Sequence, residues 1–173
     1  MYETRVNHSG AQWKTVLCVF LLAGAVACAH GLSRDAKSLV DYDGTALDVQ
    51  QSPKEFMGRV VLWGGRIIET RVLKERTDVY VLQQPLDLDD RPLSSDDYLG
   101  RFIVRSPELL DPAVFNKDLM VSVVGTLMDG EVSNIGEREY IYPVIEPKEV
   151  KVWEPKQDAT PMFHFGFGFG TQF

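Results

Sequence analysis

The chain has two cysteines, Cys18 and Cys28, and a thiol can form a disulfide, bind a metal or accept a lipid. Cys28 follows the small residues Ala25, Val26 and Ala27, which satisfy the A-x-A rule for cleavage of an export signal. Cleavage there would leave Cys28 as the only thiol of the mature chain, so that no disulfide could form within it. The candidate chemistry of this position is therefore modification of a lone sulfur at a new N-terminus.

The stretch from Ala25 to Cys28 also resembles the lipobox of bacterial lipoproteins, in which a small residue precedes a cysteine. In such a signal the sulfur receives a diacylglyceryl group, and cleavage then exposes the amine for acylation. The position three before the cysteine is most often Leu, and here it is Ala25. Three outcomes stay open: lipidation of Cys28, ordinary cleavage that releases a soluble chain, and an uncleaved anchor. Lipidation is favoured, because a lone free thiol in an oxidising compartment pairs wrongly, and because two acyl chains anchor stably.

The segment before Cys28 has the pattern of an export signal. Residues 16–29 carry no polar side chain, and Lys14 lies at their start. This run is shorter than the roughly 20 residues of a membrane-spanning helix, but it fits the apolar section of a signal peptide, which has about 7 to 15. We predict a signal peptide over residues 1–27.

The mature chain is acidic. The whole chain has a formal net charge of -7, and removal of Arg5, Lys14 and Glu3 with the signal removes a net +1, which leaves -8. Binding to a phosphate backbone needs clustered Lys and Arg, and a negative field opposes it. We therefore expect no nucleic-acid partner.

After Pro53 the sequence contains five runs rich in β-branched and aromatic residues, separated by turn signals. The runs are "GRVVLWGGRIIETRV", "TDVYVLQQPL", "GRFIVRS", "LMVSVVGTLM" and "REYIYPVIE". The pair Gly64-Gly65 predicts a bulge or sharp bend, the fourth run is expected to end at Asp129-Gly130, and Pro143 restricts the fifth to an edge or bulge.

This layout predicts a mainly β fold, a small five- to six-stranded OB-like antiparallel barrel over residues 59–153, with a sandwich variant as the alternative. "SPELLDPAVF" between the third and fourth runs predicts one or two helical turns. Residues 28–58 are expected to form the lipidated N-terminus and a tether, with a short helical or irregular lead-in. The alternation predicts that six side chains face the interior: Leu62, Val79, Val81, Phe102, Val121 and Val123.

Residues 154–173 form a tail in which aromatic residues alternate with Gly and His. Its phenylalanines are Phe163, Phe165, Phe167, Phe169 and Phe173. Such a segment can extend a sheet edge, lie at a membrane interface or contact a partner. We expect a flexible tail or an edge strand.

The sequence offers little for catalysis, and we expect no enzyme, no cofactor and no metal. The histidines after the signal are His30 and His164, and no Gly-x-Ser-x-Gly, P-loop or His-Glu-x-x-His motif occurs. Tyr140 and Tyr142 are expected to share one face of a strand in the barrel wall. The aspartates between the second and third runs predict a solvated acidic loop rather than a calcium site: Asp87, Asp89, Asp90, Asp96 and Asp97.

Several motifs in order resemble the Slp family of outer-membrane lipoproteins, named for induction by carbon starvation in enteric bacteria. They are "GGRIIET", "QQPLDLDDRP", "GRFIVR", "LLDPAVF", "VVGTLMDGEVSNIGEREYIYPVI" and "VW", which together span residues 64–153. The resemblance implies a non-enzymatic lipoprotein anchored through acylated Cys28 in the outer membrane of a Gram-negative bacterium. Ala29 agrees with that location, because Asp after the cysteine commonly retains enteric lipoproteins in the inner membrane.

Two functions are weighed. The first is a lipid-anchored envelope protein with a structural or stress-related role and an envelope protein as a further partner. The second is a periplasmic module that carries a small ligand or binds a partner. Side chains normally fill a barrel of five strands, which disfavours a large ligand cavity.

Overall fold

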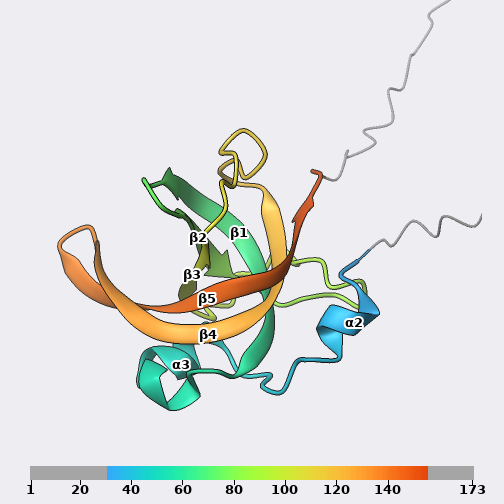
Figure 1. The fold of residues 1–173 in the computed structure, drawn as a ribbon, viewed down its shortest axis with the longest axis horizontal. Helices are drawn as coiled ribbons and strands as arrows, with labels where there is room; N and C mark the ends of the chain where they lie inside the picture. The colour runs from blue at the N-terminus through green and yellow to red at the C-terminus, as the bar shows by residue number, and fades with distance from the viewer. Residues whose placement is uncertain (1–30, 156–173) are drawn as a thin grey trace, which may run out of the picture. The chain divides into compact units, whose positions relative to one another are not determined.

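The computed structural model describes residues 31–155, and every structural statement below concerns these residues. They form a mainly β domain with three short helices in its N-terminal part (Figure 1). The predicted signal peptide, Cys28 and residues 156–173 of the tail lie outside the described residues.

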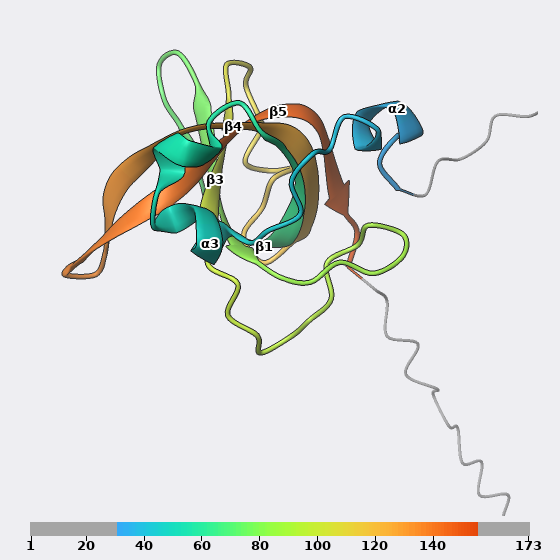
Figure 2. The same ribbon diagram turned by 90° about the horizontal axis from the view of Figure 1, so that it is seen from below.

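Five strands close into a barrel in the order β1-β2-β3-β5-β4, as Figures 1 and 2 show. Their bounds are β1 Val60–Val72, β2 Thr77–Gln83, β3 Arg101–Ser106, β4 Met120–Ile135 and β5 Arg138–Trp153. All neighbouring strands pair antiparallel except β3 and β5, which pair parallel. This order in a closed barrel is that of an OB fold, and it confirms the predicted fold class.

Apolar side chains fill the interior. Five of the six predicted inward residues are fully buried in one core cluster: Val79, Val81, Phe102, Val121 and Val123. The prediction was wrong for Leu62, because Val61 and Trp63 face the interior and Leu62 lies on the other face of β1, where it packs near Leu32. A shift of one residue in an alternating pattern moves a side chain to the opposite face of the strand.

The N-terminal segment is part of the folded domain. The helices are α2 Arg34–Lys37, α3 Ala46–Gln50 and the 3-10 helix η1 Pro53–Phe56. Ala46 and Val49 of α3 are fully buried in the core cluster, and the Ala46 amide donates a hydrogen bond to Gln83 Oε1 at 2.6 Å. Thr45 caps α3 through a reciprocal capping box with Asp48, which satisfies the free amides of this short helix.

We expected residues 28–58 to act as a tether, and the structure differs from Gly31 onward. Leu32 and Ala36 are buried beside Val124 on the outside of β4, and α3 lies below the strands in Figure 1. Because Leu32, Ala36, Ala46 and Val49 bury apolar side chains on the barrel, this segment is held by the same hydrophobic effect as the strands.

The helical turns expected in "SPELLDPAVF" are reduced to one turn. The Phe115 amide donates to the Asp111 carbonyl at 2.8 Å, and the Asp111 side chain accepts from the Ala113 amide. No helix is assigned within residues 107–119. Pro107 and Pro112 limit the backbone amides available for a longer helix.

The hairpin of β4 and β5 is longer than the sequence indicates. β4 continues past Asp129 and Gly130, which lie at a bulge, and the hairpin turns at Gly136, where φ is +62°. Pro143 lies opposite this bulge, because its neighbours Tyr142 and Val144 pair with Glu131 and Met128. The bulged position predicted for Pro143 is confirmed, whereas the strand end predicted at Asp129-Gly130 was wrong. We call residues 129–143 the arm (Figure 1).

The glycine pair in β1 allows a close approach of strands. Gly65 pairs with both β2 and β4, and a Cβ atom there would lie 1.9 Å from the Leu82 carbonyl oxygen. The irregularity in the pairing with β2 lies between Ile67 and Glu69, after the glycines. A residue larger than glycine would therefore push β1 and β2 apart.

Truncation of the Val49 side chain tests whether helix α3 belongs to the hydrophobic core. Val49→Ala is expected to lower the free energy of unfolding by about 2 kcal/mol, because it removes fully buried methyl groups and leaves a cavity. Leu88→Ala is the control, since Leu88 is 102% exposed and should change stability little. Urea unfolding of the mature chain measures both, and equal effects would contradict the packing described here.

Candidate functional site

The predicted candidate residues separate into two groups. Cys28, His30 and His164 lie outside the described residues, whereas the acidic loop and the two tyrosines lie within them. The structure therefore reports on the acidic loop, on Tyr140 and Tyr142, and on charged residues that the sequence did not single out.

The acidic loop is partly fixed by its own side chains. Asp90 is 7% exposed, and its carboxylate pairs with Lys37 Nζ at 2.8 Å. The Asp87 carboxylate accepts hydrogen bonds from the amides of Asp89 and Arg91, both at 2.9 Å. The expectation of a solvated loop was wrong for Asp90, whereas three of the aspartates are exposed as expected: Asp89, Asp96 and Asp97. Within residues 31–155, no three His, Cys, Asp or Glu side chains are placed to hold a metal ion.

Tyr140 and Tyr142 share one face of β5. Their ring centroids are 4.6 Å apart, and the Tyr142 ring meets Tyr80 of β2 edge to face at 5.4 Å. Ile103 and Val144 complete this second buried cluster, which lies on the outer side of the barrel. The arm therefore covers the outer face of β2 and β3.

Burial favours the protonated phenol at Tyr80 and Tyr140. It raises the pKa of Tyr80 above its ordinary value. Burial is also the main cause that raises the pKa of Tyr140, and a hydrogen bond with Tyr98 adds to it. Both phenols therefore keep their protons near neutral pH, and they act as packing and hydrogen-bonding groups rather than as nucleophiles.

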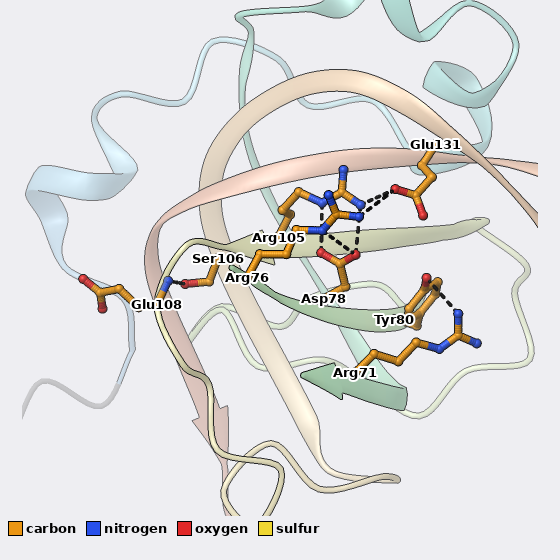
Figure 3. Close-up of polar contacts among 8 residues, drawn as sticks. All are labelled: Arg71, Arg76, Asp78, Tyr80, Arg105, Ser106, Glu108 and Glu131. Atoms are coloured by element: carbon orange, nitrogen blue, oxygen red, sulfur yellow. Dashed lines mark hydrogen bonds and ion pairs between the residues drawn. The ribbon is translucent and has the colours of Figure 1, made fainter. Parts of the chain in front are cut away.

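A charged cluster joins three strands beside the tyrosines (Figure 3). Asp78 of β2 has a side chain only 2% exposed, and both of its oxygens accept from Arg105 of β3 at 2.9 Å. Arg105 also pairs with Glu131 of the arm. Arg76 approaches Asp78 at 3.3 Å and Glu131 at 3.6 Å. Two arginines thus balance two carboxylates, so that the cluster carries no net charge.

Arg71 of β1 continues the polar contacts along the same face. Its guanidinium lies 4.5 Å from the centre of the Tyr80 ring and donates to the Tyr80 hydroxyl at 3.2 Å. It also pairs with Glu69 at 2.7 Å, and this hydrogen bond is the main cause that lowers the pKa of the Glu69 carboxyl. Cation-π and ion-pair contacts therefore both hold Arg71 in place.

A hollow of about 190 Å³ lies between the arm and this face. Arg71, Arg101, Tyr80, Ser133 and Asn134 are among the residues that line it. Arg71 and Tyr80 already have partners, and the polar lining of the hollow offers further hydrogen bonds.

The sequence did not single out the charged cluster. The alternation that puts Phe102 inside the barrel also puts Arg101 and Arg105 on the other face of β3, which is a partial signal. The side chains of Asp78 and Glu131 meet Arg105 only through the pairing of β2 with β3 and the course of the arm. No local pattern encodes that register.

Comparison with known proteins decides the family. The model of the Outer membrane lipoprotein Slp family matches residues 25–167. The chain belongs to this family. An uncharacterized protein of Haemophilus influenzae is 30% identical over 142 residues, which cover 80% of this chain and 73% of that protein. Outer membrane protein Slp of Escherichia coli is 22% identical over 153 residues, which cover 88% of this chain and 80% of that protein.

Two solved structures are similar to part of this Slp family protein. A small single-stranded DNA-binding protein from Streptomyces coelicolor has a TM-score of 0.38 at 12% identity and covers 55% of this chain and 94% of its own. The mitochondrial single-stranded DNA binding protein Rim1 of S. cerevisiae has a TM-score of 0.34 at 14% identity, with the same two coverages.

The family places this protein among the outer-membrane lipoproteins of Gram-negative bacteria, as the motifs predicted. In the range 31–155, no helix is both long and apolar enough to cross a membrane.

Neutralising Asp78 tests the charged cluster. Asp78→Asn is expected to lower the free energy of unfolding by about 2 to 3 kcal/mol, because Arg105 would lose its bidentate partner in a largely buried position. Asp118→Asn is the matched control, since the exposed pair of Asp118 and Arg66 at 3.5 Å should contribute less than about 0.5 kcal/mol. Urea unfolding compares the two, and a cost at Asp78 no larger than at Asp118 would contradict a structural role for the cluster.

Proposed function

We propose that Cys28 is the lipidated residue and that the barrel is a non-enzymatic module held by it at the outer membrane, with a structural or stress-related role. The observation that carries this proposal is the position of Ala25 to Cys28: it lies inside the family match and only three residues before the folded domain begins at Gly31. A lipobox at that point gives the module its anchor.

The interior of the barrel supports a role without a carried ligand. Phe102, Ile67 and Leu127 are fully buried there, and α3 adds Ala46 and Val49 from one end. Side chains thus occupy the space that a small ligand would need. The carrier hypothesis consequently has less support than a surface role with an envelope protein as partner.

The charged groups of the domain support a non-enzymatic role. Asp78 and Glu131 pair with arginines, and Asp90 pairs with Lys37. These ion pairs occupy the carboxylates and fix the fold around them, so that the side chains are not free to contact a substrate. These groups serve stability rather than turnover.

The acidic charge of the mature chain leads us to propose that it binds no nucleic acid. At physiological salt and micromolar protein, fluorescence anisotropy of a labelled single-stranded oligonucleotide should show no complex. The mature chain has a formal net charge of -8, which repels the phosphates. A bacterial single-stranded DNA-binding protein serves as the positive control. A micromolar, salt-sensitive complex would overturn this proposal.

Substitution of the sulfur tests the anchor. Cys28→Ser should abolish incorporation of labelled palmitate and remove the protein from the outer-membrane fraction, because no thioether can form. Cys18→Ser should leave both unchanged, since Cys18 lies within the signal. The barrel should fold in either variant. Palmitate incorporation retained in Cys28→Ser, or a mature N-terminus mapped far from residue 28, would refute the assignment.

A further inference from the structure

Both ends of the described chain lie at one corner of the barrel. A Cβ atom on Gly31 would lie 2.9 Å from the Asp89 carbonyl oxygen, so the start of the domain touches the acidic loop. Arg91 donates to the Glu154 carbonyl at 2.6 Å and lies 5.3 Å from the centre of the Trp153 ring, so the end of β5 touches it too. We call residues 31–39, 87–93 and 151–155 the terminal corner.

Leu88 of this corner is the most exposed large hydrophobic side chain within residues 31–155. It is 102% exposed, whereas Leu39 and Leu93 on the same corner are 51% and 41% exposed. The loop that carries Leu88 is rigid: Asp87 and Arg91 pair through their backbones at 2.9 Å, and Lys37 holds Asp90. Because the loop backbone is already hydrogen-bonded, insertion of Leu88 would order its side chain but little additional backbone.

The length of chain between the anchor and the domain limits where the corner can lie. Three residue steps separate Cys28 from Gly31, and a fully extended chain spans at most about 3.6 Å per residue, or roughly 11 Å in all. The headgroup layer on each side of a bilayer is about 5 to 7 Å thick. An acylated Cys28 therefore keeps the terminal corner at the membrane surface.

We propose that the terminal corner docks on the lipid bilayer, with Leu88 inserted into its apolar interface. The proposal rests on lipidation of Cys28. Gly31 lies close to the carbonyl of Asp89, which is the residue after Leu88. The short connection from Cys28 to Gly31 therefore also holds Leu88 near the lipid.

The charges of the corner indicate how it docks. Lys37 is paired with Asp90, and Arg91 and Lys151 both lie over the Trp153 ring. Arg34 is the fourth cation of the corner, and five carboxylates oppose the four cations: Asp35, Asp87, Asp89, Asp90 and Glu154. Because the corner has no excess of positive charge, attraction to anionic lipids is weak and apolar contact carries the docking.

A fluorescent label at residue 88 tests the docking. The full-length lipoprotein is made as Leu88→Cys and, as a matched control, as Val132→Cys, which replaces an apolar residue 58% exposed on the arm. Figures 1 and 2 show the arm on the side of the barrel away from α2. Each variant is labelled with a polarity-sensitive thiol probe and reconstituted into vesicles of phosphatidylethanolamine and phosphatidylglycerol.

We expect the probe at 88 to shift its emission to shorter wavelength and to lose quenching by aqueous iodide, and the probe at 132 to do neither. Equal iodide quenching at both positions would overturn the docking. Thiol titration of the parent protein separates this result from failure of the anchor, because a lipidated Cys28 leaves no free thiol. A reactive thiol there would refute the proposed anchor itself.

Discussion

The barrel closes through a very short seam. β3 and β5 pair parallel over two residue pairs, Ile103 with Val144 and Val104 with Ile145. Parallel pairing is slightly less stable per residue than antiparallel pairing, so this seam needs support from side chains on both of its faces. Inside, Phe102 and Val104 pack in the main core, and outside, Ile103 and Val144 pack with the tyrosines.

The arm and the charged cluster both support the seam between β3 and β5 from outside the barrel. The arm places Tyr140 and Tyr142 over the outer face of the seam, and Glu131 joins Arg105 next to it. Asp78 then links β2 to the same arginine. A bidentate arginine pair adds orientation as well as energy. Features that resemble a binding site on the outer face thus contribute to barrel closure.

The sequence predicted the features that depend on local alternation. Val79 and Val81, and Phe102 on the next strand, were placed correctly because a strand in a barrel wall buries every second residue. Leu62 was assigned to the wrong face of β1. The four residues "VVLW" are all apolar, so that the two-residue period of a strand does not decide which of them face inward. The charged cluster depends on register between strands distant in sequence, which no local pattern contains.

The N-terminal segment was misjudged for a different reason. A helix as short as α3 is unstable by itself. Only two side chains of "TALDVQ" are buried in the structure, and two apolar positions are too few to reveal a helical period in the sequence. The stability of α3 comes from the core against which Ala46 and Val49 pack. Of the proposed anchor, sequence reasoning supplied the cysteine and the family, and the structure supplied the terminal corner where the described chain begins and ends.

The order of the elements along the chain constrains how the molecule is made. α3 precedes every strand, yet Val49 belongs to a cluster that includes Ile145 of β5. A chain that leaves the cytoplasm N-terminus first therefore brings out the residues that plug the barrel while the last strand is still unavailable. Contacts between such distant residues form slowly. The N-terminal residues that plug the barrel therefore cannot complete the core until the C-terminal strands are available.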